Sequence, residues 1–399
     1  MKILVLNSGS SSVKYQLFEM NDSYSVLAKG LIERISLKNS KITHIVNETK
    51  KAEIAEDIPN HNTAIKKLLE HILVDPGTGV INDLSEIDGV GHRVVHGGEK
   101  FCQSVLINDD VIYTIKDCCD LAPLHNPPNL LGIEACKEVL PSTPQIAVFD
   151  TAFHQTMPKK AFVYGLPYEQ YLKYGVRRYG FHGTSHQYVS TEALKLLNKE
   201  NGNSKIITCH LGNGCSLTAV HNGKSIDTSM GMTPMEGVLM GTRCGDIDPC
   251  IILYMMEKEN LTIDDIITIL NKKSGLFGLS GKSDMRDVLL AMEKKDELAK
   301  NAIDVFVYKI VKYIGAYAAA MNGVDAIVFT AGIGEKNSYL RGRILANLTY
   351  LGIIVDEESN KAHAETISSA KSAVKIFVIP TNEELVIAQD TYKLIKNNS

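Results

Sequence analysis

Two arginines in glycine-rich surroundings are the residues best suited to hold an anion. Arg93 lies in GHRVVHGGEKF, at the end of a predicted strand, and Arg243 lies in MGTRCGD between two glycines. A guanidinium group offers a planar fork of N–H donors that matches a carboxylate or a phosphoryl group. His182, in YGFHGTSH, adds a donor in a similar setting. Together they indicate a site for an anionic substrate, although a surface ion pair is the ordinary alternative for either arginine alone.

Acidic and amide side chains close several predicted strands. Asp150 ends the strand QIAVFD, and Glu383 follows a strand that ends at Pro380. A carboxylate at the carboxyl end of a strand in an α/β protein usually faces the ligand cleft. Mg²⁺ is commonly held by one or two carboxylates together with water. We therefore expect Asp150 to face a cleft, and Glu383 to hold Mg²⁺ with Asn7.

His182 and His186 have the spacing of a helical metal-binding pair. Gly183 is expected to break the helix that such a pair needs, and no acidic third ligand is adjacent. We therefore do not predict a metal site there.

Two similar glycine turns occur in the two halves of the chain. Residues 2–12 read KILVLNSGSSS and residues 205–216 read KIITCHLGNGCS, each an apolar run followed by a turn and a second extended stretch. Glycine allows the backbone to approach phosphate oxygens closely. A third glycine loop, AGIGEK at 331–336, suits a nucleoside pocket or a plain turn, whereas SGKSD at 280–284 is not a P-loop, because Leu276 replaces its first glycine. The repeat predicts a duplicated nucleotide-binding enzyme of the actin-like type.

The elements that would position these residues alternate between strands and helices. Extended segments are expected at 2–7, 13–19, 24–30, 42–47, 89–95, 145–149, 325–330 and 375–380, and helices at 61–74, 130–138, 248–258, 262–271, 295–322 and from about 385. Residues 151–204 are predicted to be irregular. This order indicates an α/β protein with an N-terminal lobe at 1–150, joined by the helix at 385–399, and a C-terminal lobe at 151–384.

Composition excludes several classes of protein. The 399 residues carry a net charge of −4 without a basic block, which argues against nucleic-acid binding. No apolar run approaches the length of a spanning helix, and residues 7–10 interrupt the N-terminal apolar run too early for a signal peptide, so we expect a soluble, cytoplasmic protein that does not enter a membrane. The eight cysteines contain no C-x-x-C pair and are expected to be reduced and mostly buried.

Nine motifs together resemble the acetate kinase family. They are MKILVLNSGSSSVKYQLF, GHRVVHGGEKF, LAPLHNPPN, FDTAFH, RRYGFHGTSH, HLGNGCS, TPMEGVLMGTRCGDIDP, FTAGIGE and PTNEELVIA, in the family's order from residue 1 to about 390. The resemblance implies the duplicated actin-like, ribonuclease H-like fold shared with sugar kinases and Hsp70. It also implies a homodimer that makes acetyl phosphate from ATP and acetate, reversibly, with Mg²⁺ or Mn²⁺ as the metal.

The resemblance also implies residue roles. Asp150, His182 and Arg243 would be catalytic, and Asn7 and Glu383 would hold the metal. The acetate pocket would be formed by Arg93, Val95, Leu124, Phe181 and Pro234, with His125 nearby. ATP or ADP would contact Lys14, His210, Leu211, Gly212, Asn213, Gly214, Asp284, Met285, Arg286, Gly332, Ile333, Gly334, Glu335 and Lys336.

Three alternatives stay open at this point. Acetate is already ionised at neutral pH and needs no general base, so we expect Asp150 to orient Arg243 or a metal-bound water rather than to remove a proton. Propionate or butyrate kinase differs only by one or two methylenes of substrate, a small difference in binding energy. A non-catalytic actin-like ATP switch would keep the glycine turns but would not need the arginines and His182.

Overall fold

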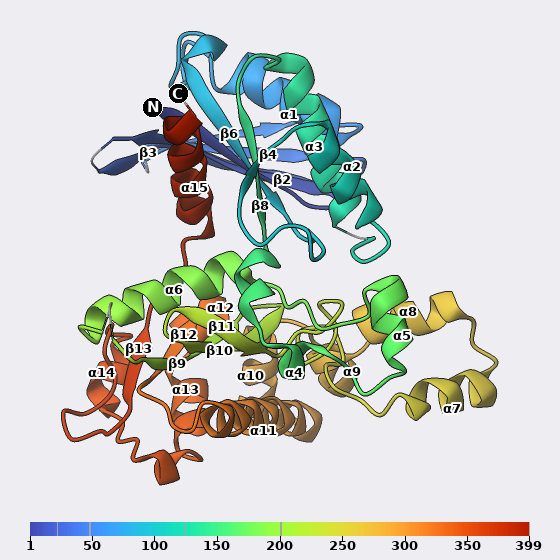
Figure 1. The fold of residues 1–399 in the computed structure, drawn as a ribbon, viewed down its shortest axis with the longest axis vertical. Coiled ribbons are helices and arrows are strands. Elements are labelled where there is room, and N and C mark those ends of the chain that lie inside the picture. The colour runs from blue at the N-terminus through green and yellow to red at the C-terminus, as the bar shows by residue number, and fades with distance from the viewer. Residues whose placement is uncertain (22, 48, 124, 200–201, 399) are drawn as a thin grey trace. The chain divides into compact units, whose positions relative to one another are not determined.

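The computed structural model describes residues 1–21, 23–47, 49–123, 125–199 and 202–398 (Figure 1). The chain forms two compact units. The first comprises Met1–Phe153 and Asn382–Ser399, and the second comprises His154–Thr381.

The first unit contains an eight-stranded sheet in the order β5-β4-β3-β2-β1-β6-β8-β7. β1, β2 and β3 pair antiparallel, whereas β6 and β8 continue the sheet in parallel with β1. The strands are β1 (Lys2–Ser8), β2 (Ser12–Met20), β3 (Tyr24–Glu33), β4 (Lys41–Val46), β5 (Lys50–Ala55), β6 (Ile87–Val94), β7 (Val105–Leu106) and β8 (Gln145–Phe149).

The second unit contains a five-stranded sheet in the order β11-β10-β9-β12-β13. Its strands are β9 (Lys205–Leu211), β10 (Cys215–His221), β11 (Lys224–Thr228), β12 (Ala326–Thr330) and β13 (Lys375–Val378). β9, β10 and β11 pair antiparallel, and β12 and β13 continue in parallel. This repeats the order β3-β2-β1-β6-β8 of the first unit, so the predicted duplication is confirmed.

Helices cover both faces of the first sheet. They are α1 (His61–Lys67), α2 (Asp109–Asp117), α3 (Asn126–Val139) and α15 (Glu383–Asn398). Alternate residues of a strand point to opposite faces. A Cβ atom added at Gly89 or Gly91 of β6 would lie within 2.6 Å of α15 side chains, so only glycine lets α15 pack this closely. Val90, between them, belongs instead to the core that contains Ala64 of α1 and Ala135 of α3.

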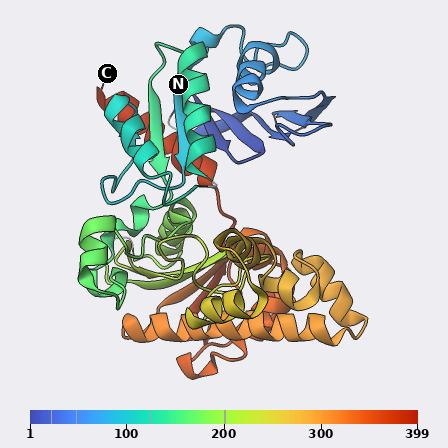
Figure 2. The ribbon, with the colours of Figure 1, turned by 90° about the vertical axis from the view of Figure 1, so that its right-hand side faces the viewer.

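The second sheet lies between α6 and α11 (Figure 1). α11 runs as one long helix along this unit (Figure 2). The helices here are α4 (Lys159–Phe162), α5 (Tyr168–Tyr174), α6 (Gly183–Leu196), α7 (Cys250–Glu259), α8 (Ile263–Lys272), α9 (Gly275–Ser280), α10 (Met285–Glu293), α11 (Glu297–Ala320), α12 (Ala331–Lys336), α13 (Ser338–Leu345) and α14 (Glu357–Lys361).

Several expectations about local structure were wrong. Residues 151–204 are not irregular, because they contain α4, α5 and the fourteen-residue helix α6. AGIGEK is not a loop but the short helix α12, which begins at Ala331 with a φ of +62°. The strand β5 and the helix α2 were not predicted.

Two further properties of the described chain bear on the sequence predictions. Among the described residues no helix combines the length and the apolar character needed to cross a membrane. The eight cysteines are free thiols. Cys118, Cys136, Cys209 and Cys215 are buried, so the expectation of mostly buried thiols holds for only half of them.

Candidate active site

Arg93 and Asp150 form a bidentate ion pair in the first unit. Arg93 Nε donates to Asp150 Oδ1 at 3.0 Å and Nη2 donates to Oδ2 at 2.5 Å. The pairing follows from the sheet, because β6 and β8 run in parallel and Asp150 N donates to Val94 O at 3.0 Å. Asp150 is 1% exposed and the Arg93 side chain 19% exposed. The structure thus pairs Asp150 with Arg93 of the same unit. Our prediction had named Arg243 or a metal-bound water as the group that Asp150 orients.

Asn7 and the start of α15 complete this cluster. Arg93 Nη1 donates to Asn7 Oδ1 at 3.3 Å, since β1 is the neighbour of β6. Burial alone would lower the pKa of Arg93, but the charges of Asp150, Glu383 and Glu384 raise it above its ordinary value. Its guanidinium group therefore stays positive.

Glu383 is a carboxylate placed among other carboxylates. Burial, followed by the charges of Asp150 and Glu384, raises the pKa of Glu383 to about 7, although Arg93 and Lys14 oppose the rise. Lys14 Nζ forms an ion pair with Glu384. A cation beside Glu383 would relieve this repulsion.

The oxygen atoms of Asn7 and Glu383 fit a hard divalent cation. Such an ion prefers carboxylate and amide oxygens, and Mg²⁺ in particular takes few protein ligands and completes its shell with water and phosphate. Within the described residues no group of three or more His, Cys, Asp or Glu side chains forms a metal cage. Two such oxygen donors would leave the rest of an ion's coordination shell to water or phosphate.

In the second unit, Arg243 and His182 meet at the glycine turn between β9 and β10. A Cβ atom added at Gly214 would lie 2.8 Å from Arg243 Nη2 and 3.6 Å from His182 Cε1. Arg243 Nη1 donates to Pro234 O at 2.5 Å. Burial lowers the pKa of Arg243, and among the described residues no carboxylate pairs with it. Its positive charge is therefore available to an anion beside the turn.

Hydroxyl groups fix the histidines around this turn. His182 precedes α6 with a φ of +75°, and its Nδ1 lies 2.8 Å from Ser216 Oγ. His186 Nε2 contacts the same oxygen at 2.7 Å, and its Nδ1 lies 2.7 Å from Thr208 Oγ1. α6 begins at Gly183 and leaves His182 outside the helix, so the two histidines do not form a helical metal-binding pair, as predicted. Both histidines instead share one hydroxyl.

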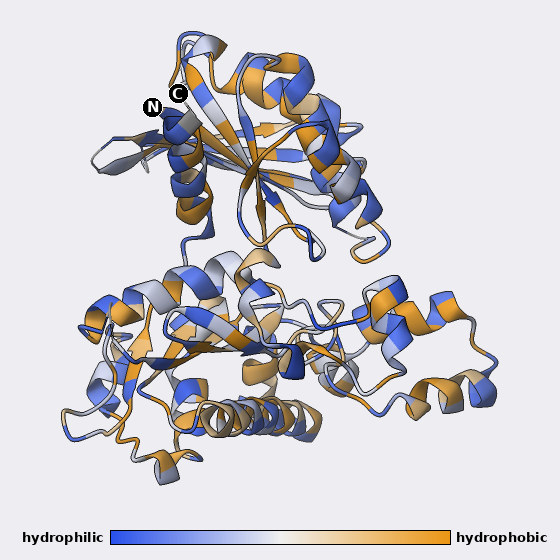
Figure 3. Ribbon diagram, in the orientation of Figure 1, coloured by the Kyte–Doolittle hydropathy of each residue, from blue (hydrophilic) through white to orange (hydrophobic). Residues whose placement is uncertain are grey.

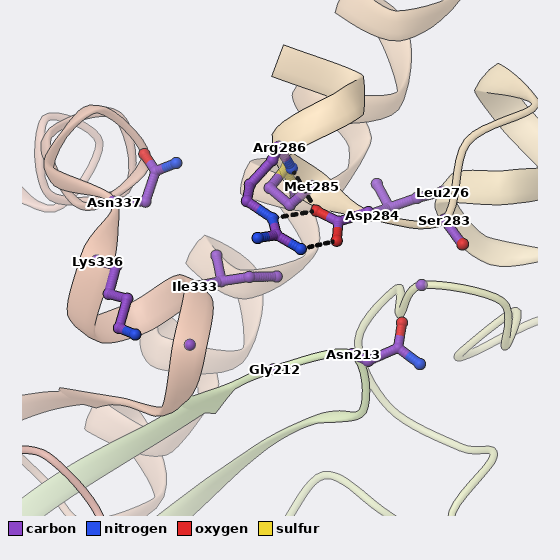
Figure 4. A pocket seen from close by; sticks show the side chains of 12 residues that line it. Gly212, Asn213, Leu276, Ser283, Asp284, Met285, Arg286, Ile333, Lys336 and Asn337 are labelled. Carbon is purple, nitrogen blue, oxygen red and sulfur yellow. Dashed lines mark hydrogen bonds and ion pairs between the residues drawn. The ribbon is translucent and has the colours of Figure 1, made fainter. Parts of the chain in front are cut away.

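A pocket of about 350 Å³ lies beside the glycine turn (Figure 4). Asp284 and Arg286 are joined above it, with Lys336 on one side and Asn213 on the other. Asp284 also caps α10, since its Oδ1 accepts from Arg286 N at 2.8 Å. The hydrogen bonds from Arg286, mainly from its side chain, lower the pKa of Asp284 to about 2. The volume is within the range of small-molecule sites.

Most of the predicted nucleotide contacts line this pocket, and some do not. Lining residues that were predicted are Gly212, Asn213, Asp284, Met285, Arg286, Gly332, Ile333 and Lys336. His210, Leu211, Gly214, Gly334 and Glu335 are close in sequence but are not among the lining residues, and Lys14 belongs to the first unit. Glu335 Oε1 instead accepts from Thr381 N at 3.3 Å.

Four lining residues were missed: Gly241, Leu276, Ser283 and Asn337. Asn337 directly follows AGIGEK and Ser283 precedes Asp284, so proximity in sequence could have indicated both. A Cβ atom at Gly241 would lie 2.0 Å from Asn213 Oδ1, which explains the need for glycine there.

The residues predicted to form the acetate pocket belong to both units. Val95 is buried in the first unit, and its N donates to Asn129 Oδ1 at 3.0 Å. Phe181 is buried in the second unit, where Pro234 lies against Arg243. Leu124 lies outside the described residues.

The duplicated sheets, with a pocket at the ends of β9 and β12 in the second unit, define an α/β protein of the actin-like, ribonuclease H-like class. The acetokinase family model matches residues 2–389. Acetate kinase from Clostridium kluyveri is 57% identical over 400 residues, covering 99% of this chain and 98% of that protein. Acetate kinase from Halothermothrix orenii is 56% identical and covers 100% of both. The chain belongs to the acetokinase family.

Solved structures agree with this assignment. The crystal structure of Porphyromonas gingivalis acetate kinase is 46% identical with a TM-score of 0.93, covering 99% of both chains. The structure of a propionate kinase from Francisella tularensis is 45% identical with a TM-score of 0.92, covering 98% of this chain and 99% of that one. The predicted family, fold class and enzyme class, a kinase, are confirmed.

Proposed function

We propose that this protein transfers the γ-phosphoryl group of ATP to acetate, reversibly, giving acetyl phosphate and ADP. The observation that carries the proposal is the position of Arg243. Its guanidinium group lies against the Gly214 turn beside His182, next to a nucleotide-sized pocket. A cation at the end of a phosphate-binding turn can stabilise the charge of a phosphoryl group in transfer.

The second unit would bind the nucleotide. The nucleoside would occupy the pocket bounded by Asp284, Arg286 and Gly332, and its phosphates would follow the turn at Gly212–Gly214. His182, held by Ser216, would donate to the transferring group. These roles are supported by the pocket lining and by the contacts of His182.

The first unit would bind the acid. Arg93 would hold the acetate carboxylate, and Asp150 would keep the guanidinium plane oriented through its two hydrogen bonds. Asn7 and Glu383 would hold Mg²⁺ together with phosphate oxygens, and Lys14 would contact ATP. The bound ion would neutralise charge on the phosphates.

The chemistry demands positioning and charge neutralisation more than proton transfer. Acetate is a carboxylate with a reference pKa of roughly 4 to 5, so at neutral pH it is ionised and attacks directly. The repulsion between this anion and the triphosphate is the main barrier, and two guanidinium groups and a cation oppose it. We infer that the two units close around the substrates and exclude water, since an open site would hydrolyse ATP.

Propionate is the second candidate acceptor. The similarity to the propionate kinase from Francisella tularensis is nearly equal to that of the acetate kinase structure, so overall likeness does not separate the two acids. The bulk of Val95, Leu124 and Phe181 favours the two-carbon acid.

We also propose that the enzyme is a homodimer. Helix α7 has no buried residue, and Ile251, Leu253 and Tyr254 are 44%, 67% and 62% exposed. Hydrophobic residues are concentrated on this helix (Figure 3). An exposed apolar surface of this kind is typical of an interface, and the family resemblance supports a second copy of the chain as its partner.

A hydroxylamine trap for acyl phosphates tests the proposed function. The purified protein is incubated with ATP, Mg²⁺ and acetate, propionate or butyrate, and the hydroxamate formed is measured. We expect acetate to give the highest kcat/KM. A higher kcat/KM for propionate would identify propionate as the preferred substrate. ATP hydrolysis without any hydroxamate would contradict phosphoryl transfer to the acid.

A further inference from the structure

The segment between β11 and α7, residues 229–249, carries both Pro234 and Arg243. It contains no helix or strand. An irregular segment of this length is usually mobile unless side chains hold it, and an arginine that stabilises a transition state must be held accurately. The question is therefore what fixes this segment.

Arg178 holds its first part. Arg178 Nη1 donates to the carbonyl oxygens of Thr228 at 2.8 Å and Ser229 at 3.0 Å, and more weakly to Met230 at 3.3 Å. Arg178 Nη2 donates to Glu236 Oε1 at 2.6 Å. The Arg178 side chain is 16% exposed, so these bonds are shielded from water.

Tyr164 and Glu236 hold its middle part. Tyr164 OH donates to Glu236 Oε2 and accepts from Met232 N at 3.1 Å. A Cβ atom added at Gly231 would lie 1.8 Å from Glu236 Oε2 and 2.3 Å from Tyr164 OH, so the backbone closes directly over this pair. Burial, and secondly the charge of Glu236, raise the pKa of Tyr164, which keeps its hydroxyl protonated as a donor.

A second pair of contacts closes the loop that carries Arg243. Asp246 Oδ1 accepts from Gly237 N at 2.8 Å, and Asp246 N donates to Gly237 O at 2.8 Å. Tyr313 of α11 donates to Asp246 Oδ2 at 2.7 Å. Residues 237–246 are therefore tied at both ends, with Arg243 between them.

Pro234 connects these contacts to the guanidinium group. Its carbonyl accepts from Arg243 Nη1, and it lies two residues before Glu236. Given the proposed function, on which this inference rests, we propose that Arg178, Glu236 and Tyr164 are positioning residues that hold Pro234 and thereby aim Arg243 at the transferring phosphoryl group.

Tyr164→Phe is the mildest test, because it removes one hydroxyl and keeps the ring. We expect kcat to fall about 10- to 100-fold, the scale of a misplaced catalytic group, with the KM for ATP little changed. Glu236→Gln should lower kcat in the same way and serves as the second variant. Matched controls are Tyr15→Phe, a buried tyrosine that hydrogen-bonds His44, and Asp304→Asn, the partner of Arg343. Both controls should retain kcat.

A double-mutant cycle separates positioning from a general loss of structure. In an Arg243→Ala background, Tyr164→Phe should change kcat less than about twofold, because the guanidinium group that Tyr164 positions is absent. An equal loss in both backgrounds would overturn the proposal. Failure of the unmodified protein to form acyl phosphate would instead contradict the proposed function, and the two outcomes are distinguishable.

Discussion

At the residue scale, the two arginines are held in different ways. Arg93 is bound by a buried carboxylate, whereas Arg243 is bound by a backbone carbonyl. The charge of Arg93 is therefore partly compensated within the protein, whereas no carboxylate among the described residues pairs with Arg243. This difference suits Arg93 to orient a carboxylate and Arg243 to stabilise charge that develops in the reaction.

Asp150→Asn tests whether Asp150 orients or removes a proton. The amide presents one N–H₂ group toward the arginine and cannot keep both hydrogen bonds, so kcat should fall by about 10²-fold or more. The circular dichroism spectrum should be unchanged, and the pH profile of kcat should gain no new alkaline limb. If formate or another small base restored the rate, the orienting role would be wrong.

His92 gives the first unit a titratable group whose effect on stability has a definite sign. It is buried against Gln145, and burial lowers its pKa to about 4. In the unfolded chain the pKa of this histidine is near 6.5. As the pH falls from 6.5 toward 4, the unfolded chain therefore binds a proton that the folded chain does not bind. This group therefore contributes stability above pH 6.5 that is lost below it.

His92→Gln removes this titration. The free energy of unfolding of the unmodified protein, relative to the variant, should fall by about 2 to 3 kcal/mol between pH 7 and pH 4.5. Urea unfolding of both proteins at the two pH values measures this difference. A difference that is the same at both values would contradict the assignment.

At the scale of elements, helix α12 brings Gly332 to the pocket. A Cβ atom added at Gly332 would meet no atom of the described residues within 4 Å, apart from its chain neighbours and its own helix backbone, so alanine fits at this position. Alanine is also favoured over glycine within a helix by roughly 0.5 to 1 kcal/mol. The open space is the pocket itself.

Gly332→Ala should therefore keep or slightly raise the melting temperature and yet weaken ATP binding by about tenfold, through lost room for the nucleotide. Calorimetric titration with ATP measures the affinity. Gly165→Ala is the matched control, because Gly165 is equally open but does not line the pocket. Equal affinities for both variants would place the nucleotide elsewhere.

The elements differ in how far the sequence predicts them. The strands with continuous apolar runs, such as β8 and β12, were predicted within a residue, because all their residues are buried. α6 was missed because polar residues, among them Ser185, His186 and Ser190, form part of its buried face. β5 was missed because its residues are almost all exposed and show no alternation.

The residues of the candidate site also differ in how far the sequence predicts them. Residues in glycine-rich motifs, such as Gly212 and Arg243, could be predicted because their chemistry is local. Ser216, Glu236 and Tyr164 could not, since their roles arise only when segments distant in sequence pack together. The ion pair of Asp150 with Arg93 was not predicted for the same reason.

At the scale of the whole molecule, the predicted homodimer can be tested through α7. Replacing Leu253 by Glu would place a charge on an apolar surface that we expect a second copy to cover. The variant should be a monomer by light scattering, whereas the unmodified protein should have twice that mass. Leu298→Glu, which changes an equally exposed leucine on α11, is the control and should not alter the mass. A dimeric Leu253 variant would place the interface elsewhere.

The central claim is that Arg93 of the first unit and Arg243 of the second act on one reacting group. The most direct measurement is a crystal structure of the protein with ADP, Mg²⁺, acetate and a planar metal fluoride that imitates the phosphoryl group in transfer. We predict that Arg93 contacts the acetate carboxylate and Arg243 contacts the planar fluoride in the same site. A bound analogue that leaves either guanidinium group without contact to acetate or fluoride would contradict the account.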